Sequence, residues 1–269
     1  MSLKTRFIVN PFSGVSQQKK IERYLKSDLD TDRFEYEISY TQAPGHATEL
    51  AREAVAQGMD VVVAVGGDGS VNEVAAALID TSSTLGILPA GSGNGLAMHL
   101  GLGRDLRRAI QKLNSAQEIK IDTCLLNKRP YVNLAGVGLD AEVAIRLKQS
   151  KRRGFLPYFH NTIKELFSYQ SKTYELRIDG ELLPAQEYIL IEVANAPMFG
   201  YNFEVAPLAK FDDGLLEVML FRKSSIWKYI LTARRFLDSS IHESSIAERY
   251  SCKELTISGP RPIAVHVDG

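Results

Sequence analysis

The chain has few cysteines and no long apolar run. Its 269 residues include only Cys124 and Cys252, neither of which has a histidine or cysteine at metal-ligand spacing. Structural zinc and a disulfide framework are therefore both disfavoured, and a reducing cytoplasm fits best. No stretch reaches the roughly 18 apolar residues of a membrane span. The sequence predicts no transmembrane segment, so a lipid ligand would be met from outside the bilayer.

Neither charge is in excess, because Lys plus Arg and Asp plus Glu both count 32. No overall field attracts a polyanion, so a nucleic-acid partner is disfavoured. One local basic run, Lys148 with 151–153, precedes the aromatic and apolar stretch Phe155–Phe159. This run suits either contact with anionic headgroups at a membrane surface or a solvated loop before a core helix.

Several catalytic motifs are also missing. No Gly-Lys-Ser/Thr follows a glycine loop, and no glycines have the dinucleotide-binding spacing. The five histidines form no zinc-protease pair, and there is no Gly-x-Ser-x-Gly elbow. These absences disfavour P-loop enzymes, hydride-transfer enzymes, zinc proteases and serine hydrolases.

The first half of the chain alternates short apolar runs with amphipathic segments, which predicts an α/β domain with a Rossmann-like parallel sheet over residues 1–118. The expected strands are Thr5–Val9, Phe34–Tyr40, Val61–Val65 and Leu85–Leu88. The expected helices are Gln17–Lys26, Ala47–Gln57, Val71–Leu78 and Leu96–Leu100.

The pattern then changes to β-rich segments, which predict an antiparallel sandwich over residues 119–269. The expected strands are Ile119–Leu126, Tyr131–Leu134, Tyr174–Ile178, Tyr188–Ala194, Leu215–Phe221, Glu254–Ile257 and Ile263–Val267. The expected helices are Ala141–Lys148, Phe159–Tyr169 and Ile226–Leu237.

The strongest single feature is the loop Gly66-Gly67-Asp68-Gly69-Ser70 between a buried-type strand and a helix. Glycines let backbone amides approach an anion, and the start of the helix adds its positive dipole end. Asp68 would repel a phosphate unless a metal ion or a transferable proton lies between them. The loop therefore indicates metal-phosphate chemistry, and the alternative is that Asp68 merely caps the helix.

A second glycine loop, Gly91-Ser92-Gly93-Asn94, follows the next strand and again opens a helix. The segment from Asn10 to Gly14 follows the first strand and Thr41 follows the second. Because parallel strand ends meet at one edge of a sheet, all four loops should lie together. Two neighbouring anion-binding loops suit a triphosphate.

These motifs resemble a known family. Asn-Pro-x-Ser-Gly at 10–14, Gly-Gly-Asp-Gly-Ser-x-Asn-Glu at 66–73 and Pro-Ala-Gly-Ser-Gly-Asn at 89–94 look like the signatures of the diacylglycerol-kinase catalytic-domain family, which includes bacterial lipid kinases and sphingosine kinases. The similarity continues through 133–141 and 210–216. The same superfamily contains NAD kinases.

The resemblance implies binding sites for ATP and magnesium. Asp68 would belong to the network that holds the catalytic Mg²⁺, and a structural Mg²⁺ would bind the Asp213 carboxylate and the carbonyls of Lys210 and Leu215. The residues expected to contact ATP are Asn10, Pro11, Phe12, Ser13, Gly14, Thr41, Gly66, Gly67, Asp68, Gly69, Ser70, Asn72, Glu73, Gly91, Ser92, Gly93 and Asn94.

Two positions depart from the family pattern. Gly95 stands where bacterial lipid kinases usually carry an aspartate, which resembles the sphingosine-kinase loop instead. The sequence ends at Asp268-Gly269, where the family commonly continues with a glutamate taken to be the general base and then a segment that returns to the first domain. The base would then lie just beyond Gly269, or Asp68 or Asp268 would take its place.

The sequence thus predicts an ATP- and Mg²⁺-dependent kinase that phosphorylates a lipid hydroxyl, on a diacylglycerol, a phosphatidylglycerol or a sphingoid base. We expect a cytoplasmic protein that meets its lipid at the membrane surface, and a homodimer remains open. The rival hypotheses are an NAD kinase and a nucleotide- or lipid-binding protein without catalytic activity.

Overall fold

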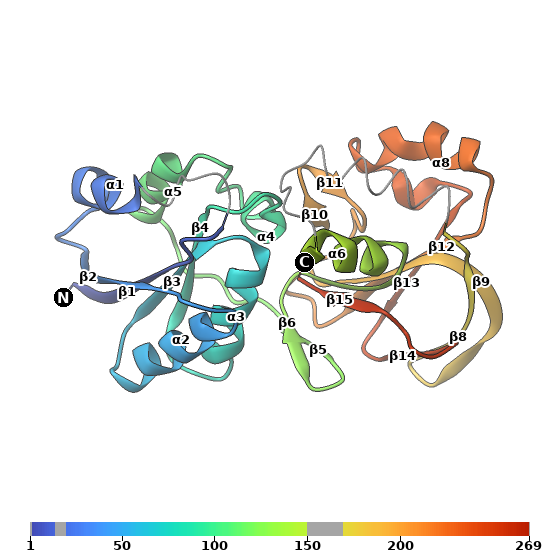
Figure 1. Cartoon of the computed structure of the whole chain (residues 1–269), viewed down its shortest axis with the longest axis horizontal. Helices are drawn as coiled ribbons and strands as arrows, with labels where there is room; N and C mark the ends of the chain where they lie inside the picture. Colours follow the sequence, from blue (N-terminus) through green and yellow to red (C-terminus); the bar gives the residue numbers. More distant parts are fainter. Residues whose placement is uncertain (1, 14–19, 150–168, 269) are drawn as a thin grey trace. The chain divides into compact units, whose positions relative to one another are not determined.

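The computed structural model describes residues 2–13, 20–149 and 169–268. The chain divides into two compact units, Met1–Lys120 and Ile121–Gly269. The division lies close to the boundary expected at residue 118. Figure 1 shows the first unit in blue to green and the second in green to red.

Unit 1 is a parallel sheet covered on both faces by helices. Its strands are β1 (Leu3–Val9), β2 (Phe34–Tyr40), β3 (Val61–Gly66) and β4 (Thr84–Pro89), in the order β2-β1-β3-β4. The helices are α1 (Ile21–Asp28), α2 (His46–Ala56), α3 (Asp68–Leu78), α4 (Gly95–His99) and α5 (Leu106–Leu113). The predicted Rossmann-like sheet is confirmed.

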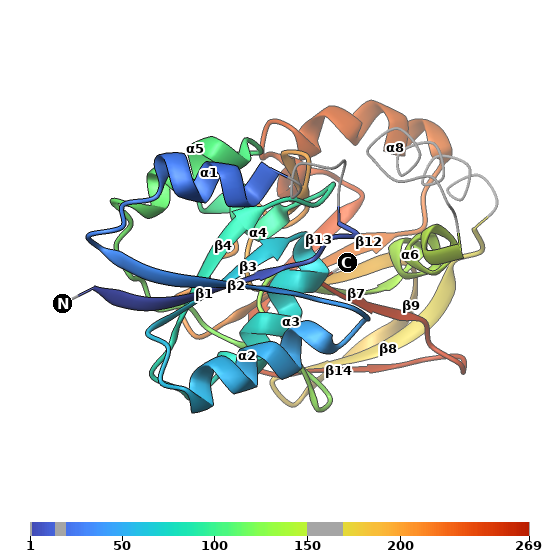
Figure 2. The ribbon, with the colours of Figure 1, turned by 60° about the vertical axis from the view of Figure 1, so that its left-hand side comes forward.

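The sheet is built around an inner strand, β3, that is apolar on both faces. Every residue of β3 is buried, as expected for a strand covered by helices on each side. Helices α1 and α5 pack together on one face, and α2 and α3 on the other (Figure 2). Helix α1 buries Ile21 and Leu25, four residues apart, which is the spacing of one helical side.

Unit 2 is an antiparallel β-rich domain, as predicted. The main sheet runs β13-β12-β9-β7-β15, and β8 and β14 extend it from β9. Its strands are β7 (Leu134–Gly138), β8 (Lys172–Ile178), β9 (Glu181–Ala194), β12 (Leu216–Arg222), β13 (Ala247–Cys252), β14 (Leu255–Ser258) and β15 (Val265–Val267). Smaller pairs are β5 (Cys124–Leu126) with β6 (Arg129–Tyr131), and β10 (Met198–Gly200) with β11 (Phe203–Glu204).

Some predicted boundaries in unit 2 were wrong. The strand expected at Ile119–Leu126 contains only β5, and Ile119 is 58% exposed. The strand expected at Tyr131–Leu134 is interrupted at Asn133, whose carbonyl accepts hydrogen bonds from the amides of Asn195 and Ala196. Strand β9 is longer than expected because its first half pairs with β8. Strand β13 was not predicted.

Four helical segments are described in unit 2. They are α6 (Leu139–Gln149), α8 (Ile226–Thr232) and the 3₁₀ turns Ala233–Phe236 and Ile241–Glu243. The helix predicted at 159–169 lies outside the described residues except for its last position. Among the described residues, no helix is both long and apolar enough to cross a membrane.

Both cysteines are buried free thiols in unit 2. Burial raises the pKa of Cys124 to about 12 and that of Cys252 to about 11. Cys124 packs with Tyr131 and Ala135, and Cys252 lies in the apolar core formed by β8, β9 and β12. Neither is placed as a nucleophile or metal ligand, because the thiolate is the reactive form.

Candidate functional site

The carboxyl edge of the unit 1 sheet carries the predicted phosphate loops. Strand β1 lies between β2 and β3, so the chain continues to one side of β1 first and to the other side later. The loops that follow β1 and β3 therefore diverge at this point of the sheet. Open α/β sheets bind ligands at such a point. Asn10 follows β1 and Gly67 follows β3, and the side-chain amide of Asn10 donates to the Ser70 hydroxyl at 3.1 Å. The two loops are thus tied together where they diverge.

The loop after β1 closes on Asn10. The Asn10 carbonyl accepts hydrogen bonds from the backbone N–H and the hydroxyl of Ser13, and its side-chain oxygen accepts one from the Phe12 N–H at 3.0 Å. Phe12 is 66% exposed. Thr41 is buried at the end of β2, where its N–H donates to the Val9 carbonyl. Gly14 lies outside the described residues.

The two glycine loops touch through glycine backbones. A side chain at Gly91 would place its Cβ 2.3 Å from the Gly67 Cα, and one at Gly67 would lie 3.1 Å from the Gly91 Cα. No residue other than glycine fits this contact without displacing backbone atoms. The contact explains why both loops need glycine at these positions, independently of any ligand.

Asp68 joins the first glycine loop to the second. Its carboxylate oxygens accept hydrogen bonds from the backbone N–H groups of Asn94 at 2.9 Å and Gly95 at 2.6 Å. These amides open α4, so Asp68 caps a helix other than the one it begins. The sequence analysis considered Asp68 as a cap of the helix that it opens, whereas these two contacts go to the start of α4. The carboxylate is held at the loop that was expected to bind phosphate.

Asn94 fixes the shape of the second loop. Its backbone is left-handed, with φ of 56°, and its side chain both accepts from the Gly91 N–H and donates to the Gly91 carbonyl, each at 2.9 Å. Ser92 and Gly93 are half-buried at the tip of the resulting turn. Hydrogen bonds within the loop therefore fix the shape of the turn, and its tip remains partly exposed to solvent.

Glu73 contacts the end of the loop after β2 and the start of α2. Its carboxylate accepts hydrogen bonds from the backbone N–H groups of Gly45 and Ala47, at 3.0 and 3.2 Å, and so holds the start of α2. Asn72 is half-buried on α3, Pro11 is half-buried beside Phe12, and Gly69 is exposed in the first turn of α3. The structure brings most of the predicted ATP residues to one edge and gives Glu73 a packing contact instead.

Gly91→Ala is expected to destabilise unit 1 by about 1–3 kcal/mol, because the new methyl group would collide with the Gly67 backbone. Urea unfolding checks this. Gly69→Ala is the matched control, since its Cβ would meet nothing within 4 Å and alanine favours a helix. Equal stability of the two variants would contradict the close contact.

In unit 2, the predicted metal residues lie on an exposed turn before β12. The Asp213 carboxylate accepts a hydrogen bond from the Leu215 N–H at 3.1 Å, and Asp122 accepts one from the Gly214 N–H at 2.7 Å. The Asp122 N–H donates to the Phe211 carbonyl. Two carboxylates thus border a turn that also presents the carbonyls of Lys210 and Leu215. Oxygen ligands of this kind suit a hard cation such as Mg²⁺.

Asp268 is an anchor for the end of the sheet. It is 2% exposed, and its carboxylate accepts hydrogen bonds from the backbone N–H groups of Val132, Asn133 and Leu134 at 2.9–3.0 Å. Its own N–H donates to the Leu134 carbonyl at 2.8 Å. Both oxygens of this carboxylate are thus engaged by backbone donors. The geometry favours a positioning role over the base role considered from the sequence.

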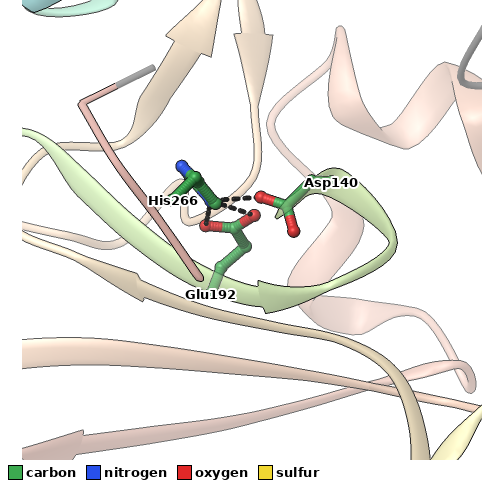
Figure 3. A group of neighbouring side chains, drawn as sticks. All are labelled: Asp140, Glu192 and His266. Atoms are coloured by element: carbon green, nitrogen blue, oxygen red, sulfur yellow. Dashed lines mark hydrogen bonds and ion pairs between the residues drawn. The ribbon is translucent and has the colours of Figure 1, made fainter. Parts of the chain in front are cut away.

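The structure also brings together three ionisable side chains that the sequence analysis missed: Asp140, Glu192 and His266 (Figure 3). Glu192 and His266 both pair in register with Gly136, one from β9 and one from β15. Because Gly136 has no side chain, the two flanking side chains meet above it, where a Cβ would lie only 2.3 Å from the His266 Nε2. Asp140, from the first turn of α6, completes the group.

The group is buried and its charges are linked. His266 Nε2 forms an ion pair with Asp140 and lies 3.4 Å from Glu192 Oε2. Burial alone would lower the pKa of His266, but the two carboxyl groups outweigh it and hold that pKa well above 6.5. Burial and the nearby Asp140 raise the pKa of Glu192 well above 4.5. Burial also acts to raise the pKa of Asp140, but the nearby His266 outweighs burial and keeps the pKa of Asp140 below its usual value.

The three donor atoms lie within 4.8 Å of one another, which would also permit metal binding. Protons alone can balance the charges, because a protonated His266, an ionised Asp140 and a neutral Glu192 sum to zero. Beside the group lies a hollow of about 440 Å³ between α6 and β15, whose lining includes Lys128, Arg129, Ile145, Val265 and His266. Unit 2 therefore has a recess with both apolar and basic residues next to the buried group.

Stability is expected to fall as the pH rises from mildly acidic to mildly alkaline. Above pH 4.5 for Glu192 and above 6.5 for His266, the folded chain keeps protons that the unfolded chain loses. Each such proton contributes a slope of about −1.4 kcal/mol per pH unit until the folded pKa is passed. Urea unfolding across this range should show the decline, and Glu192→Gln should reduce it. An identical decline of stability with pH in Glu192→Gln and in the unchanged chain would contradict the raised pKa of Glu192.

Comparisons with known proteins identify the family of the chain. The family model described as "Diacylglycerol kinase catalytic domain" matches residues 4–126, and "YegS C-terminal NAD kinase beta sandwich-like domain" matches residues 133–269. Two curated relatives named "Diacylglycerol kinase" are both 28% identical to this chain. The one from Bacillus subtilis aligns over 86% of this chain and 77% of its own length, and the one from Staphylococcus aureus (strain bovine RF122 / ET3-1) over 100% and 86%.

A crystal structure titled as a diacylglycerol kinase, from Bacillus anthracis, superposes with a TM-score of 0.79 at 24% identity, over 99% of this chain and 89% of that one. At this identity the superposition supports the fold. The family models together match most of the chain, and the second alone matches more than half. The chain therefore belongs to the diacylglycerol-kinase catalytic-domain family and carries that family's YegS-type C-terminal domain.

Proposed function

We propose that this protein is an ATP- and Mg²⁺-dependent kinase that phosphorylates the hydroxyl group of a diacylglycerol-type lipid. The observation that carries the proposal is the pair of glycine loops at the carboxyl edge of the unit 1 sheet, which Asp68 holds together. Family membership and the names of the relatives support a lipid acceptor.

In this proposal, backbone N–H groups of the two glycine loops receive the ATP phosphates, with Asn10, Ser13 and Thr41 at the neighbouring strand ends. Asp68 keeps the second loop in place and belongs to the carboxylate network that would hold Mg²⁺. When bound, Mg²⁺ would neutralise charge on the phosphates. Positioning and electrostatics of this kind supply most of the catalysis in phosphoryl transfer.

The reaction forms a bond between the acceptor oxygen and the γ-phosphorus and breaks the bond to the β–γ bridging oxygen. The acceptor proton must go to a base. Asp268 accepts three backbone hydrogen bonds, so we propose that it positions the chain. The family resemblance implies that this base is a glutamate.

The acceptor is a diacylglycerol or a related lipid alcohol. The relatives' names favour diacylglycerol. Gly95, which resembles the sphingosine-kinase loop, keeps a sphingoid base as the second candidate. In the structure, the Gly95 N–H donates to Asp68, a contact that any residue except proline could make.

The deciding experiment measures Mg²⁺-dependent ADP release and the phosphorylated product with diacylglycerol, phosphatidylglycerol, sphingosine and NAD. It uses this chain and a longer version that includes the expected glutamate. Turnover of one lipid supports the proposal, and turnover in the longer version alone assigns the base. Phosphorylation of NAD would favour an NAD kinase, and ATP binding without turnover in either version would favour a binding protein.

Asp213→Asn is expected to abolish a Mg²⁺-dependent increase in thermal stability. An ion that binds only the folded state contributes about 2.7 kcal/mol at a concentration 100-fold above its Kd. Differential scanning calorimetry with Mg²⁺ or EDTA measures the shift. Asp212→Asn, an exposed neighbour on the same turn, is the control and should keep it. A Mg²⁺ response that survives in Asp213→Asn would remove this turn as the metal site.

A further inference from the structure

Helix α8 carries large apolar side chains that face solvent. Trp227, Ile230 and Leu231 are spaced three and four residues apart, so they line one side of the helix. They are 69%, 45% and 80% exposed, and Leu237, just after the following 3₁₀ turn, is 61% exposed. We call these four residues the α8 apolar face. Clustered exposed apolar side chains of this size commonly mark a binding surface.

The fold does not need this face, because α8 is attached through other side chains. Tyr229 and Phe236 pack against the apolar core of unit 2. The Phe236 ring stacks on Phe203 with centroids 4.6 Å apart, and the Tyr229 hydroxyl donates to the Arg222 carbonyl. Helix α8 lies on the outside of unit 2 (Figure 1). In the part of the chain that the structure describes, the packing of α8 leaves these four side chains exposed.

The segment that carries the face is positively charged, and the acidic residues Asp238 and Glu243 lie just after it, where Glu243 pairs with Arg235 at 3.6 Å. Between Ser224 and Leu237 the chain carries three basic residues, Lys228, Arg234 and Arg235, and no acidic residue, although the whole chain has equal numbers of each charge. The Arg234 side chain is 89% exposed, and its ion pair with Asp238 is long, at 3.9 Å. Tryptophan and leucine beside lysine and arginine are typical of helices that lie at the surface of anionic membranes.

We propose that the α8 apolar face docks on an anionic lipid bilayer. Trp227 and Leu231 enter the boundary between headgroups and acyl chains, while Lys228 and Arg234 contact the lipid phosphates. This inference rests on the proposed function, because a lipid acceptor makes a membrane the surface that the enzyme must meet. The basic run predicted for this role at 148–153 lies outside the residues whose side chains are described.

Trp227 is the only tryptophan of the chain, so its fluorescence reports directly on this face. With vesicles of phosphatidylcholine and phosphatidylglycerol, we expect its emission to shift to shorter wavelength and to be quenched by brominated acyl chains. Vesicles of phosphatidylcholine alone should give little change. Lys228→Glu with Arg234→Glu should weaken binding about tenfold or more. Binding to vesicles with unchanged Trp227 emission would overturn the proposal.

A matched pair of double variants separates this face from general surface hydrophobicity. Trp227→Ser with Leu231→Ser should lower vesicle co-sedimentation about tenfold or more. Leu125→Ser with Leu182→Ser removes two other exposed side chains of unit 2, 68% and 50% exposed, and should leave binding unchanged. Equal losses would overturn the proposal. A dimer that the first pair converts to a monomer would assign the face to a second copy of the chain instead.

Failure of this inference can be distinguished from failure of the proposed function, because vesicle binding needs no ATP. With a short-chain diacylglycerol dispersed below its aggregation limit, the Trp227→Ser with Leu231→Ser variant should keep its turnover, whereas turnover on vesicles should fall. Unchanged turnover of this variant on vesicles would overturn the docking site and leave the proposed kinase activity standing. Insertion of Trp227 into vesicles without turnover of any acceptor would support the docking site and overturn the proposed kinase activity.

Discussion

Asp68→Asn is expected to lower kcat/KM for ATP-dependent lipid phosphorylation by about 10²–10³-fold. The carboxylate accepts hydrogen bonds from two backbone N–H groups that open α4, one on each oxygen. An amide has one oxygen and one NH₂ group, so in the variant an NH₂ group would face one of these N–H donors. The second glycine loop should then separate from the first, and the negative charge proposed for magnesium binding is lost as well.

Steady-state kinetics and calorimetric ATP titration measure this effect together. We expect weaker ATP binding as well as slower turnover, because the loops are proposed to hold the phosphates. Asp80→Asn is the matched control. It makes the same chemical change at an exposed position with a left-handed backbone, which asparagine accepts readily. Full activity in Asp68→Asn would show that the carboxylate is needed for neither loop contact nor metal binding.

His266→Ala is expected to destabilise the chain by about 3–5 kcal/mol, because removing one partner of a buried ion pair leaves the other charge uncompensated. Asp140 would lose its ion-pair partner, and Glu192 would lie beside it without the imidazole. Glu192→Gln should cost only about 1 kcal/mol at mildly acidic pH, where the raised pKa keeps Glu192 neutral and an amide resembles it.

Urea unfolding of Asp140→Asn, of His266→Ala and of the variant that carries both changes measures the coupling of this ion pair. The double variant removes both members of the ion pair, so it should cost less than the sum of the two single changes. Additive losses would mean that Asp140 and His266 are independent packing positions and that their ion pair has no energetic basis.

The parallel sheet and its phosphate loops could be predicted because their signals are local. Strands β3 and β4 of unit 1 are short apolar runs that lead into glycine loops, so Gly67, Asp68 and Gly91 could be placed at one edge. The contact of Glu73 with the start of α2 could not be predicted, because it depends on how two helices pack.

The buried group in unit 2 depends on strand register, which the sequence alone does not specify. Asp140, Glu192 and His266 are far apart along the chain and meet because β9 and β15 both pair with β7 at Gly136. One local signal was present. Glu192 is a lone charge within the apolar run from Tyr188 to Ala194, and buried charges usually have a partner.

The burial of Cys124 and Cys252 has a practical consequence for testing membrane contact. Both thiols are withdrawn from solvent and their raised pKa values leave almost no thiolate at neutral pH. A cysteine introduced at an exposed site such as Leu231 would therefore be the preferred target of a maleimide probe in the otherwise unchanged chain. Depth-sensitive spin labels or fluorophores could be attached to single positions along α8 without replacing either native cysteine.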